Sequence, residues 1–338
     1  MIADLALLAG LAAAIATPAS FSRDWRLALL AHFRPHLAVT CGVLALVVAA
    51  VDLPTGPKLA FMALLIGVAA VHVREIVRST PTGAPIAGNA RLRIAAANVQ
   101  RNNTARQSVI DWVRREKVDV FVAAEAVRGW TAALAALQDE LPHVAGHPSG
   151  DVLIFSRHPL TGEPRHLFAN VGYAVAVEIA GLTVIGVHTA SPEDANHSRA
   201  CDELIDMVGA FVRSGTGPIA AVGDFNATPW SAPIVRLIAG TGLAYGPGAR
   251  LGSFPARWAG VDVPAWLGIP IDLVLAGRGA RVAGRRHGPR VGSDHWPVVA
   301  EIVYEARGDF SPDNNPAPVS ASSALNVDDS GPASSHSA

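Results

Sequence analysis

A carboxylate and an amide stand two residues apart at the end of an apolar stretch in the second half of the chain. Residues 219–222 are entirely apolar, and Gly223, Asp224, Phe225 and Asn226 follow them. This pattern predicts a buried strand that stops at the glycine. If the extended geometry persists, Asp224 and Asn226 point to one side and Phe225 turns into the core. Together they suit a phosphate group and an activated water, although Asp-x-Asn is also common in turns.

Several other predicted strands end in a single polar residue, or carry one beside their first residue. These residues are Asn98, Glu125, His188, Asp272, and Asp294 with His295. Each one alone has an ordinary structural explanation, as a turn residue, an exposed acid or a hydrogen-bonded histidine. If the set has no function, every one of these structural explanations must be correct at the same time. The set therefore indicates a site where strand ends meet.

The elements that must position this set are predicted from residues 92–304. Short apolar runs alternate there with amphipathic helical patterns. This alternation predicts an α/β domain built as a two-layer β-sandwich flanked by helices. No internal repeat, Walker loop or dinucleotide-binding fingerprint points to another architecture.

The first 78 residues differ in composition from the rest and predict a membrane region. Three apolar stretches, at about residues 3–20, 36–52 and 58–74, predict about three transmembrane helices, although each is slightly short of the roughly 20 residues that span a bilayer. Asp4 and the absence of early Lys or Arg argue against a cleaved signal peptide. We therefore expect a multi-pass protein of the cell inner membrane, with membrane lipid as a partner.

Two further segments are predicted from composition. Residues 79–91 are rich in Pro, Gly and Thr and predict a linker to the domain at 92–304. Residues 305–338 are rich in Ser, Pro, Asn, Asp and Ala, which cannot bury a core, and predict a disordered tail.

The basic residues near the apolar stretches predict orientation. Arg23, Arg26 and Arg34 lie in the link after the first stretch, on the same side as the arginines that follow the third, whereas the other side carries Lys58. The positive-inside rule then favours a cytoplasmic position for the domain. The predicted orientation is the same if the first stretch does not span the membrane. The count of basic residues on each side is weaker evidence if residues 20–36 form an interfacial helix.

The residue types of the set predict the cofactor. Oxygen donors dominate, the histidines are too few for a zinc cluster, and the two cysteines, Cys41 and Cys201, lie outside the set. Mg²⁺ or Mn²⁺ is the expected ion. Residues 91–304 contain 20 Arg or Lys and 19 Asp or Glu, a net charge of +1, which is low for tight non-specific binding to nucleic acid.

Six short motifs resemble those of the endonuclease/exonuclease/phosphatase superfamily, which has the DNase I-like fold. They are ANVQ (97–100), AAEA (123–126), GVHT (186–189), VGDFNATP (222–229), IPID (269–272) and GSDHWPV (292–298). The resemblance covers about residues 92–303. The three apolar stretches and the sequence HFRPH at 32–36 also resemble the bacterial membrane-attached branch of that superfamily.

The resemblance implies a metal site. Glu125 would bind the metal, with Asn98 and Asp294 close to it. Gln100 departs from the pattern, because many nucleases of the superfamily have an acidic residue there, and this weakens the case for a second metal. Ala124 also stands where Gln or Glu is frequent, which argues against nuclease-like specificity.

The resemblance also implies catalytic roles. Asp224 would orient or deprotonate the attacking water, and Asn226 would contact the phosphate. His188 would stabilise the transition state or protonate the leaving oxygen. His295, paired with Asp272, would act as a base or as a phosphate ligand.

The expected function is that of a membrane-anchored, divalent-metal-dependent phosphoester hydrolase. Its substrate would be nucleic acid or a lipid-linked phosphate, and the near-neutral domain with its membrane region favours the lipid. Arg285 and Arg286, in the arginine-rich stretch 278–290, are candidate phosphate ligands, or else part of a solvated basic loop. The alternative function is a catalytically idle, membrane-tethered binding module, and no obligate protein partner is inferred.

Overall fold

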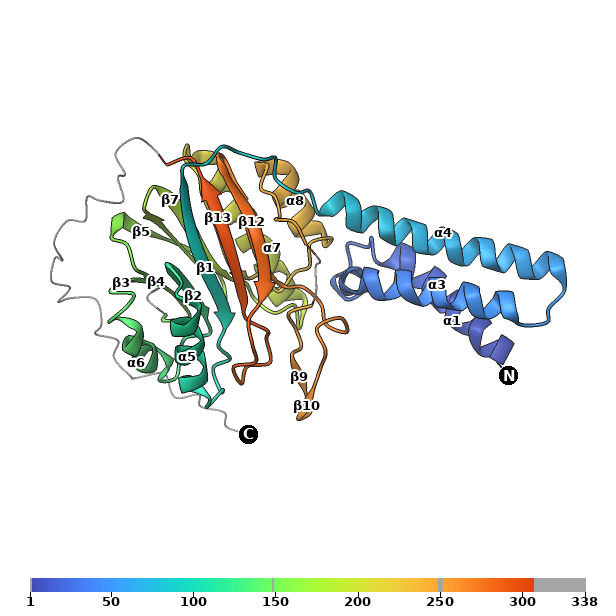
Figure 1. The fold of residues 1–338 in the computed structure, drawn as a ribbon. Coiled ribbons are helices and arrows are strands. Elements are labelled where there is room, and N and C mark those ends of the chain that lie inside the picture. Colours follow the sequence, from blue (N-terminus) through green and yellow to red (C-terminus); the bar gives the residue numbers. More distant parts are fainter. Residues whose placement is uncertain (1, 148, 249–251, 307–338) are drawn as a thin grey trace.

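The structure is a computed structural model that describes residues 2–147, 149–248 and 252–306. An elongated bundle of N-terminal helices projects from one side of an α/β domain (Figure 1). The bundle contains α1 (Ile2–Ala19), α2 (Trp25–Ala28), a 3₁₀ helix (Leu29–Phe33), α3 (Arg34–Ala50) and α4 (Thr55–Ser79).

The helices of the bundle pack around a small apolar core and leave other apolar side chains exposed. Cys41 and Leu65 are fully buried, whereas the side chains of Leu46 and Val39 face outward. Within the described residues, two segments are long and apolar enough to cross a membrane, namely Trp25–Ala50 and Thr55–Ser79. The apolar segment Leu8–Ala19 of α1 is shorter, so two such segments are found where the sequence predicts about three.

The α/β domain contains two large sheets. One has six strands, in the spatial order β12 (Ala280–His287), β13 (Val298–Tyr304), β1 (Ala90–Asn98), β2 (Val120–Ala124), β4 (Val152–Ser156) and β3 (His143–Gly146). The other has five, in the order β11 (Asp272–Gly277), β8 (Ile219–Asp224), β7 (Leu182–His188), β6 (Gly172–Ile179) and β5 (Leu160–Ala169). A small hairpin pairs β9 (Arg257–Trp258) with β10 (Val261–Asp262).

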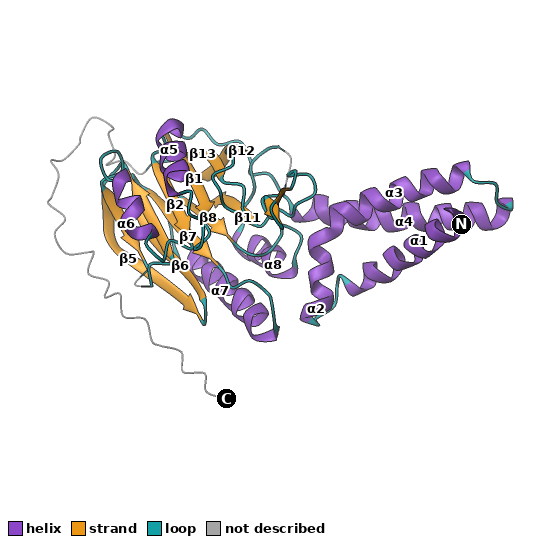
Figure 2. Ribbon diagram, turned by 90° about the horizontal axis from the view of Figure 1, so that it is seen from below, coloured by secondary structure: helices purple, strands orange, loops and turns teal. Residues whose placement is uncertain are grey.

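The two sheets pack face to face, and helices cover their outer faces. Ile94, Val122, Val184 and Val222 belong to the core between the sheets. The helices α5 (Arg106–Glu116) and α6 (Trp130–Leu134), with a 3₁₀ turn at Ala135–Leu137, pack on the six-stranded sheet. The helices α7 (Ala195–Ser214) and α8 (Ala232–Thr241) pack on the five-stranded sheet. This is the two-layer sandwich flanked by helices that the sequence predicts (Figure 2).

Strand register brings chemically important residues to one edge of the sandwich. In the five-stranded sheet, Asp224 lies opposite His188 on one side and Asp272 on the other. In the six-stranded sheet, Asn98 at the end of β1 lies opposite Ala124, which precedes Glu125. The predicted meeting of strand ends is therefore present in the described structure.

Two predicted segments have a different outcome. The arginine-rich stretch 278–290 is mostly strand β12 at the edge of the six-stranded sheet, and not a loop. Of the predicted tail 305–338, residues 307–338 lie outside the described residues.

Gly223 provides a stability test of the strand that carries Asp224. Its φ is +138°, and a Cβ atom there would lie 2.1 Å from the carbonyl oxygen of Val187 on the neighbouring strand. We expect Gly223→Ala to lower the free energy of unfolding by roughly 2–6 kcal/mol, because steric overlap adds to backbone strain. Chemical denaturation in detergent measures this, with Gly284→Ala as the control, since no atom lies within 4 Å of the added Cβ there. Equal stability of the two variants would contradict the close approach of β7 and β8.

Candidate active site

Asp224 lies at the centre of the site and is almost completely buried at the end of β8. Two imidazoles face one of its carboxylate oxygens, Oδ2. The Nε2 atom of His295 lies 3.8 Å from it, and the Nε2 atom of His188 lies 4.0 Å from it. Burial raises the pKa of Asp224, against the opposing effect of the nearby histidines. The residue therefore combines a buried carboxylate with two potential cationic neighbours.

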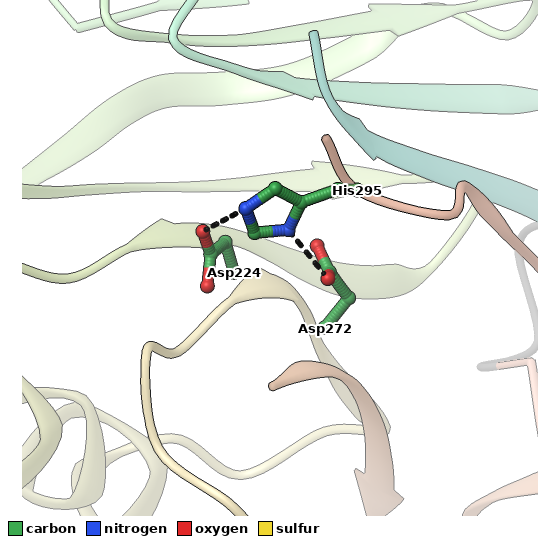
Figure 3. Close-up of side chains that lie close together, drawn as sticks. All are labelled: Asp224, Asp272 and His295. Atoms are coloured by element: carbon green, nitrogen blue, oxygen red, sulfur yellow. Dashed lines mark hydrogen bonds and ion pairs between the residues drawn. The ribbon is translucent and has the colours of Figure 1, made fainter. Parts of the chain in front are cut away.

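His295 connects Asp224 to Asp272 (Figure 3). Its Nδ1 atom donates to Oδ2 of Asp272 at 2.8 Å, so Nε2 faces Asp224. The Ser253 hydroxyl accepts from the backbone N–H of Asp272, and the Ser293 hydroxyl accepts from the backbone N–H of His295. Burial alone would lower the pKa of His295, but the carboxylates of Asp272 and Asp224 raise it to about 10. The imidazole is therefore a cation at neutral pH in the metal-free protein.

His188 forms a second pair of the same kind, with Asp151. Its Nδ1 atom donates to Oδ2 of Asp151 at 2.5 Å, which leaves Nε2 facing Asp224. Burial lowers the pKa of His188, but the hydrogen bond and charge of Asp151 outweigh this and raise it. Two carboxylate–histidine pairs thus point at one carboxylate.

Asp151 is absent from the residues that the sequence predicts, although it is an essential part of this geometry. It precedes strand β4, which runs antiparallel to β2, with Val152 opposite Ala124. In an antiparallel strand the start, and not the end, lies at the edge where the parallel strands finish. A polar residue at the start of a predicted strand, and not only at its end, is the sequence signal that points to Asp151.

Asn98 joins the two sheets at the site. Its Nδ2 atom donates to Oε1 of Glu125 at 3.2 Å and to Oδ2 of Asp224 at 3.0 Å. The Asn98 side-chain oxygen accepts from the backbone N–H of Gln100 at 2.9 Å. The amide therefore fixes the distance between the carboxylates of Glu125 and Asp224, which come from different sheets.

Glu125 is held as a carboxylate by Arg101, another residue that sequence reasoning missed. The backbone N–H and Nε of Arg101 donate to Oε2 of Glu125 at 2.9 and 3.0 Å. Partial burial would raise the pKa of Glu125, but these bonds, together with His188 and Asn98, lower it to about 2. Glu125 and Gln100 both have φ of 57°, a left-handed conformation that is costly for residues other than glycine.

Asn226 does not continue the strand geometry that the sequence expectation assumed. Its φ is 44°, and its backbone N–H donates to Oδ1 of Asp224, so the chain turns directly after the strand. The Asn226 side chain donates to the carbonyl oxygen of Thr189 at 2.9 Å. Phe225 is fully buried, as expected. Asn226 thus lies beside Asp224 through a turn, because local side-chain to backbone bonding competes with extended structure.

The remaining predicted residues are Asp294, Arg285 and Arg286, and they differ in whether their side chains contact the site. Asp294 is half-buried, and burial raises its pKa, with Glu125 adding to this effect while His295 opposes it. Arg285 donates from Nη2 to the backbone oxygen of Asp272 at 3.0 Å, next to the site. Arg286 forms an ion pair with Glu116 at the end of α5. The structure therefore groups Arg285 with the site and engages Arg286 elsewhere.

The donor set fits a divalent metal ion. Five carboxylates, of Asp151, Asp224, Asp272, Asp294 and Glu125, surround the site. Among the described residues, the side chains of His188, His295 and Arg101 are bonded to these carboxylates or face them, and Arg285 donates to the backbone oxygen of Asp272. Oxygen donors of this kind suit Mg²⁺ or Mn²⁺. Two positions could hold such an ion, one at the carboxylate of Glu125, next to Asn98, whose amide donates to Glu125, and one among Asp224, Asp272 and His295, whose ligand atoms lie within 4.8 Å of one another.

The first position offers an ionised ligand, whereas the second contains a protonated one. In the second, the hydrogen bond between His295 and Asp272 uses Nδ1 of the imidazole, and the raised pKa keeps a proton on Nε2. A protonated nitrogen cannot ligate a metal. Glu125, by contrast, is ionised at any ordinary pH and is only partly buried.

The raised pKa of His295 predicts a pH dependence of stability. Its ordinary value of 6.5 rises to about 10 in the folded protein, so the stabilisation is complete below pH 6.5 and is lost as pH rises through 10. In EDTA, the difference in free energy of unfolding between wild type and His295→Gln should shrink across this range. Denaturant titrations at several pH values measure it, with the exposed His166→Gln as control. A difference that stays constant would contradict a protonated His295.

No curated protein matches this chain. Among solved structures, an endonuclease/exonuclease/phosphatase from Beutenbergia cavernae is 18% identical with a TM-score of 0.50, over 64% of this chain and 72% of that one, which shows a shared fold.

Two other solved structures are similar. Sphingomyelinase C from Streptomyces griseocarneus is 16% identical, with a TM-score of 0.47 over 63% of this chain and 99% of that one. A 3′ phosphatase from Neisseria bound to a product DNA hairpin is 18% identical, with a TM-score of 0.49 over 62% and 98%. The family model described as Endonuclease/Exonuclease/phosphatase family matches residues 95–295, more than half of the chain. The protein therefore belongs to this family of phosphoester hydrolases, with a DNase I-like fold.

Proposed function

We propose that the protein is a membrane-anchored phosphoester hydrolase that depends on a divalent metal ion. The observation that carries this proposal is the buried Asp224 between two carboxylate–histidine pairs, next to the ionised Glu125. Hydrolysis of a phosphoester needs an oriented water, donors for the phosphoryl oxygens and a proton for the leaving oxygen. The described residues offer a group for each of these tasks.

Asp224 is the group that orients the attacking water and accepts its proton. Burial raises its pKa, which makes it a stronger base than an exposed aspartate. The water oxygen forms a bond to phosphorus while the bond from phosphorus to the leaving oxygen breaks. The leaving oxygen then takes a proton, for which His188, held by Asp151, is the donor.

His295 and Asn226 hold the phosphoryl group. The cationic His295, fixed by Asp272, and the Asn226 amide supply hydrogen bonds to the oxygens on which negative charge develops. Glu125 would hold the metal ion, with Asn98 and Asp294 beside it. A bound divalent ion neutralises charge on the phosphoryl oxygens.

Substitution of the central carboxylate tests the catalytic assignment. In full-length protein in detergent, Asp224→Asn should lower kcat for bis-p-nitrophenyl phosphate or p-nitrophenyl phosphate by on the order of a hundredfold or more. Asp151→Asn should also lower kcat, because His188 loses its orienting partner. The matched control is Asp206→Asn, an exposed position on α7. Wild-type protein that hydrolyses neither ester with Mg²⁺ or Mn²⁺ would instead favour a binding module.

Metal titration tests the position of the ion. Glu125→Gln should weaken Mn²⁺ binding, measured by isothermal titration calorimetry, by on the order of tenfold or more, because it removes a ligand charge. Asp272→Asn should weaken it less, and the exposed Glu203→Gln should leave it unchanged. The reverse order, with Asp272→Asn more damaging than Glu125→Gln, would place the ion in the buried group of Asp224, Asp272 and His295.

We further propose that the domain faces the cytoplasm. Arg23 and Arg34 line a cavity together with residues of the α/β domain, Arg26 lies between them in α2, and Arg74 and Arg78 lie in the last turns of α4, from which the chain leads into the domain. The positive-inside rule places such basic residues in the cytoplasm. Alkaline phosphatase fused after Tyr304 should therefore be inactive, because that reporter works only outside the cytoplasm. Fluorescent protein at the same position should fluoresce. An active phosphatase fusion would place the domain on the other side.

A further inference from the structure

A cavity of about 560 Å³ lies between the N-terminal helices and the α/β domain. One wall comes from residues 20–34 and from α4, and the other from the first turns of α7 and α8. Figure 2 shows α2 next to α7 and α8 at this junction. The volume lies within the roughly 300–1,000 Å³ of ordinary small-molecule sites. Asn226 also lines the cavity, and its backbone N–H donates to Asp224. The cavity therefore extends to a direct neighbour of the central carboxylate.

Buried hydrogen-bond donors line this cavity without partners among the described residues. The side chain of Arg34 is 3% exposed, and its Nε and Nη1 atoms have no hydrogen-bond partner there. Its Nη2 atom donates to the Ser20 backbone oxygen, and the guanidinium group stacks on Phe21 at 4.1 Å. On the opposite wall, Nε1 of Trp230 is buried and unpaired. Leaving two nitrogens of a buried guanidinium unpaired is costly, so these donors indicate an acceptor that the described residues do not supply.

The charge of the cavity favours an anion. Its lining includes three arginines, at 23, 34 and 236, and two carboxylates, of Glu75 and Asp202. Asp202 is already paired with Arg236 at 3.3 Å. Glu75, which pairs with Arg74 at 3.5 Å, also acts on the charge of Arg34. Arg23 is therefore the lining arginine without a lining carboxylate opposite it in these pairs. The positive end of the α8 dipole also faces the cavity, because Ser231 and Ala232 at its N-terminus are part of the wall. A phosphate group matches this surrounding better than a neutral or cationic one.

The other part of the lining is apolar and continues into the membrane helices. Phe21, Trp25 and Leu29 line the cavity, directly before α3. The segment Trp25–Ala50 is long and apolar enough to cross a bilayer. Tryptophan is common at the boundary between lipid tails and headgroups. A ligand that satisfies both parts carries a phosphate at one end and an apolar chain at the other.

We propose that this cavity binds the phosphate-bearing headgroup of a membrane lipid and presents it to the catalytic site through Asn226. The proposal rests on the proposed hydrolase function and names its substrate class. Free phosphate esters offer the same oxyanion, but they leave the apolar wall unused. The lipid enters between the N-terminal helices and the first turns of α7 and α8, with its chain beside the bundle.

Binding is measured first, on the full-length protein in detergent with EDTA present, so that hydrolysis does not interfere. The probe is dioctanoyl phosphatidic acid, titrated by calorimetry. Ala232→Trp fills the cavity from an exposed position on α8 and should weaken binding at least tenfold, whereas Ala239→Trp on the same helix should bind as wild type does. Arg34→Gln should also weaken binding at least tenfold, compared with Arg74→Gln, which changes an exposed arginine on α4.

Ala232→Trp keeps the test decisive if Arg34→Gln does not fold. Wild-type affinity in Ala232→Trp would overturn the proposal. Glycerol 3-phosphate, which has the phosphate without the chains, should bind at least tenfold more weakly than the lipid. Equal affinity for the two would overturn the lipid assignment in favour of a soluble phosphate.

A hydrolysis assay separates the proposal of a lipid-binding cavity from the proposal that the protein is a phosphoester hydrolase. Phosphatidic acid in phosphatidylcholine nanodiscs and bis-p-nitrophenyl phosphate in solution are given to each variant with Mg²⁺. Ala232→Trp should lose at least tenfold more activity on the lipid than on the soluble ester. Turnover of the soluble ester without any lipid binding would overturn the cavity proposal alone. Lipid binding that requires the cavity, without turnover of any ester, would overturn the hydrolase and retain the lipid site.

Discussion

The site depends on one electrostatic constraint, which is the burial of the Asp224 carboxylate between two imidazoles. An isolated carboxylate at this depth would be strongly destabilising. His188 and His295 offset that cost only while Asp151 and Asp272 hold their far nitrogens, so both pairs are needed at once. The strands that supply these residues must therefore end or begin within hydrogen-bonding distance of one another. The registers of β7, β8 and β11 meet this requirement for His188, Asp224 and Asp272, whereas Asp151 and His295 precede β4 and β13 of the other sheet.

The same constraint explains how the two sheets are joined at this edge. Asn98 comes from one sheet and Asp224 from the other, and a single amide group bonds to Asp224 and to Glu125. Apolar packing between the sheets is non-directional, whereas a hydrogen bond depends on distance and angle. The polar edge therefore adds a directional constraint on the relative position of the sheets.

Sequence patterns predicted the buried strands and the residues at their ends. They missed site residues whose position depends on the direction of strand pairing, and strands at the half-exposed edge of a sheet. Asp151 escaped because β4 runs antiparallel to β2, so its first residue and not its last reaches the site. Strand β12 escaped because an edge strand has no continuous apolar run. The bond between Arg101 and Glu125 requires the left-handed turn at Gln100, which no local pattern announces.

The cavity next to Asn226 could not be predicted from any single stretch of sequence. Its walls come from residues 20–34 and from the beginnings of α7 and α8, which lie more than 150 residues further along the chain. Arg34 in the sequence reads as one more basic residue near a membrane helix, and only its burial and its unpaired nitrogens distinguish it. Reaction chemistry is thus determined within the α/β domain by strand register. Access of a substrate to the site is determined by how the N-terminal helices pack on that domain. The residues that set the chemistry and those that set the access can therefore change independently in sequence.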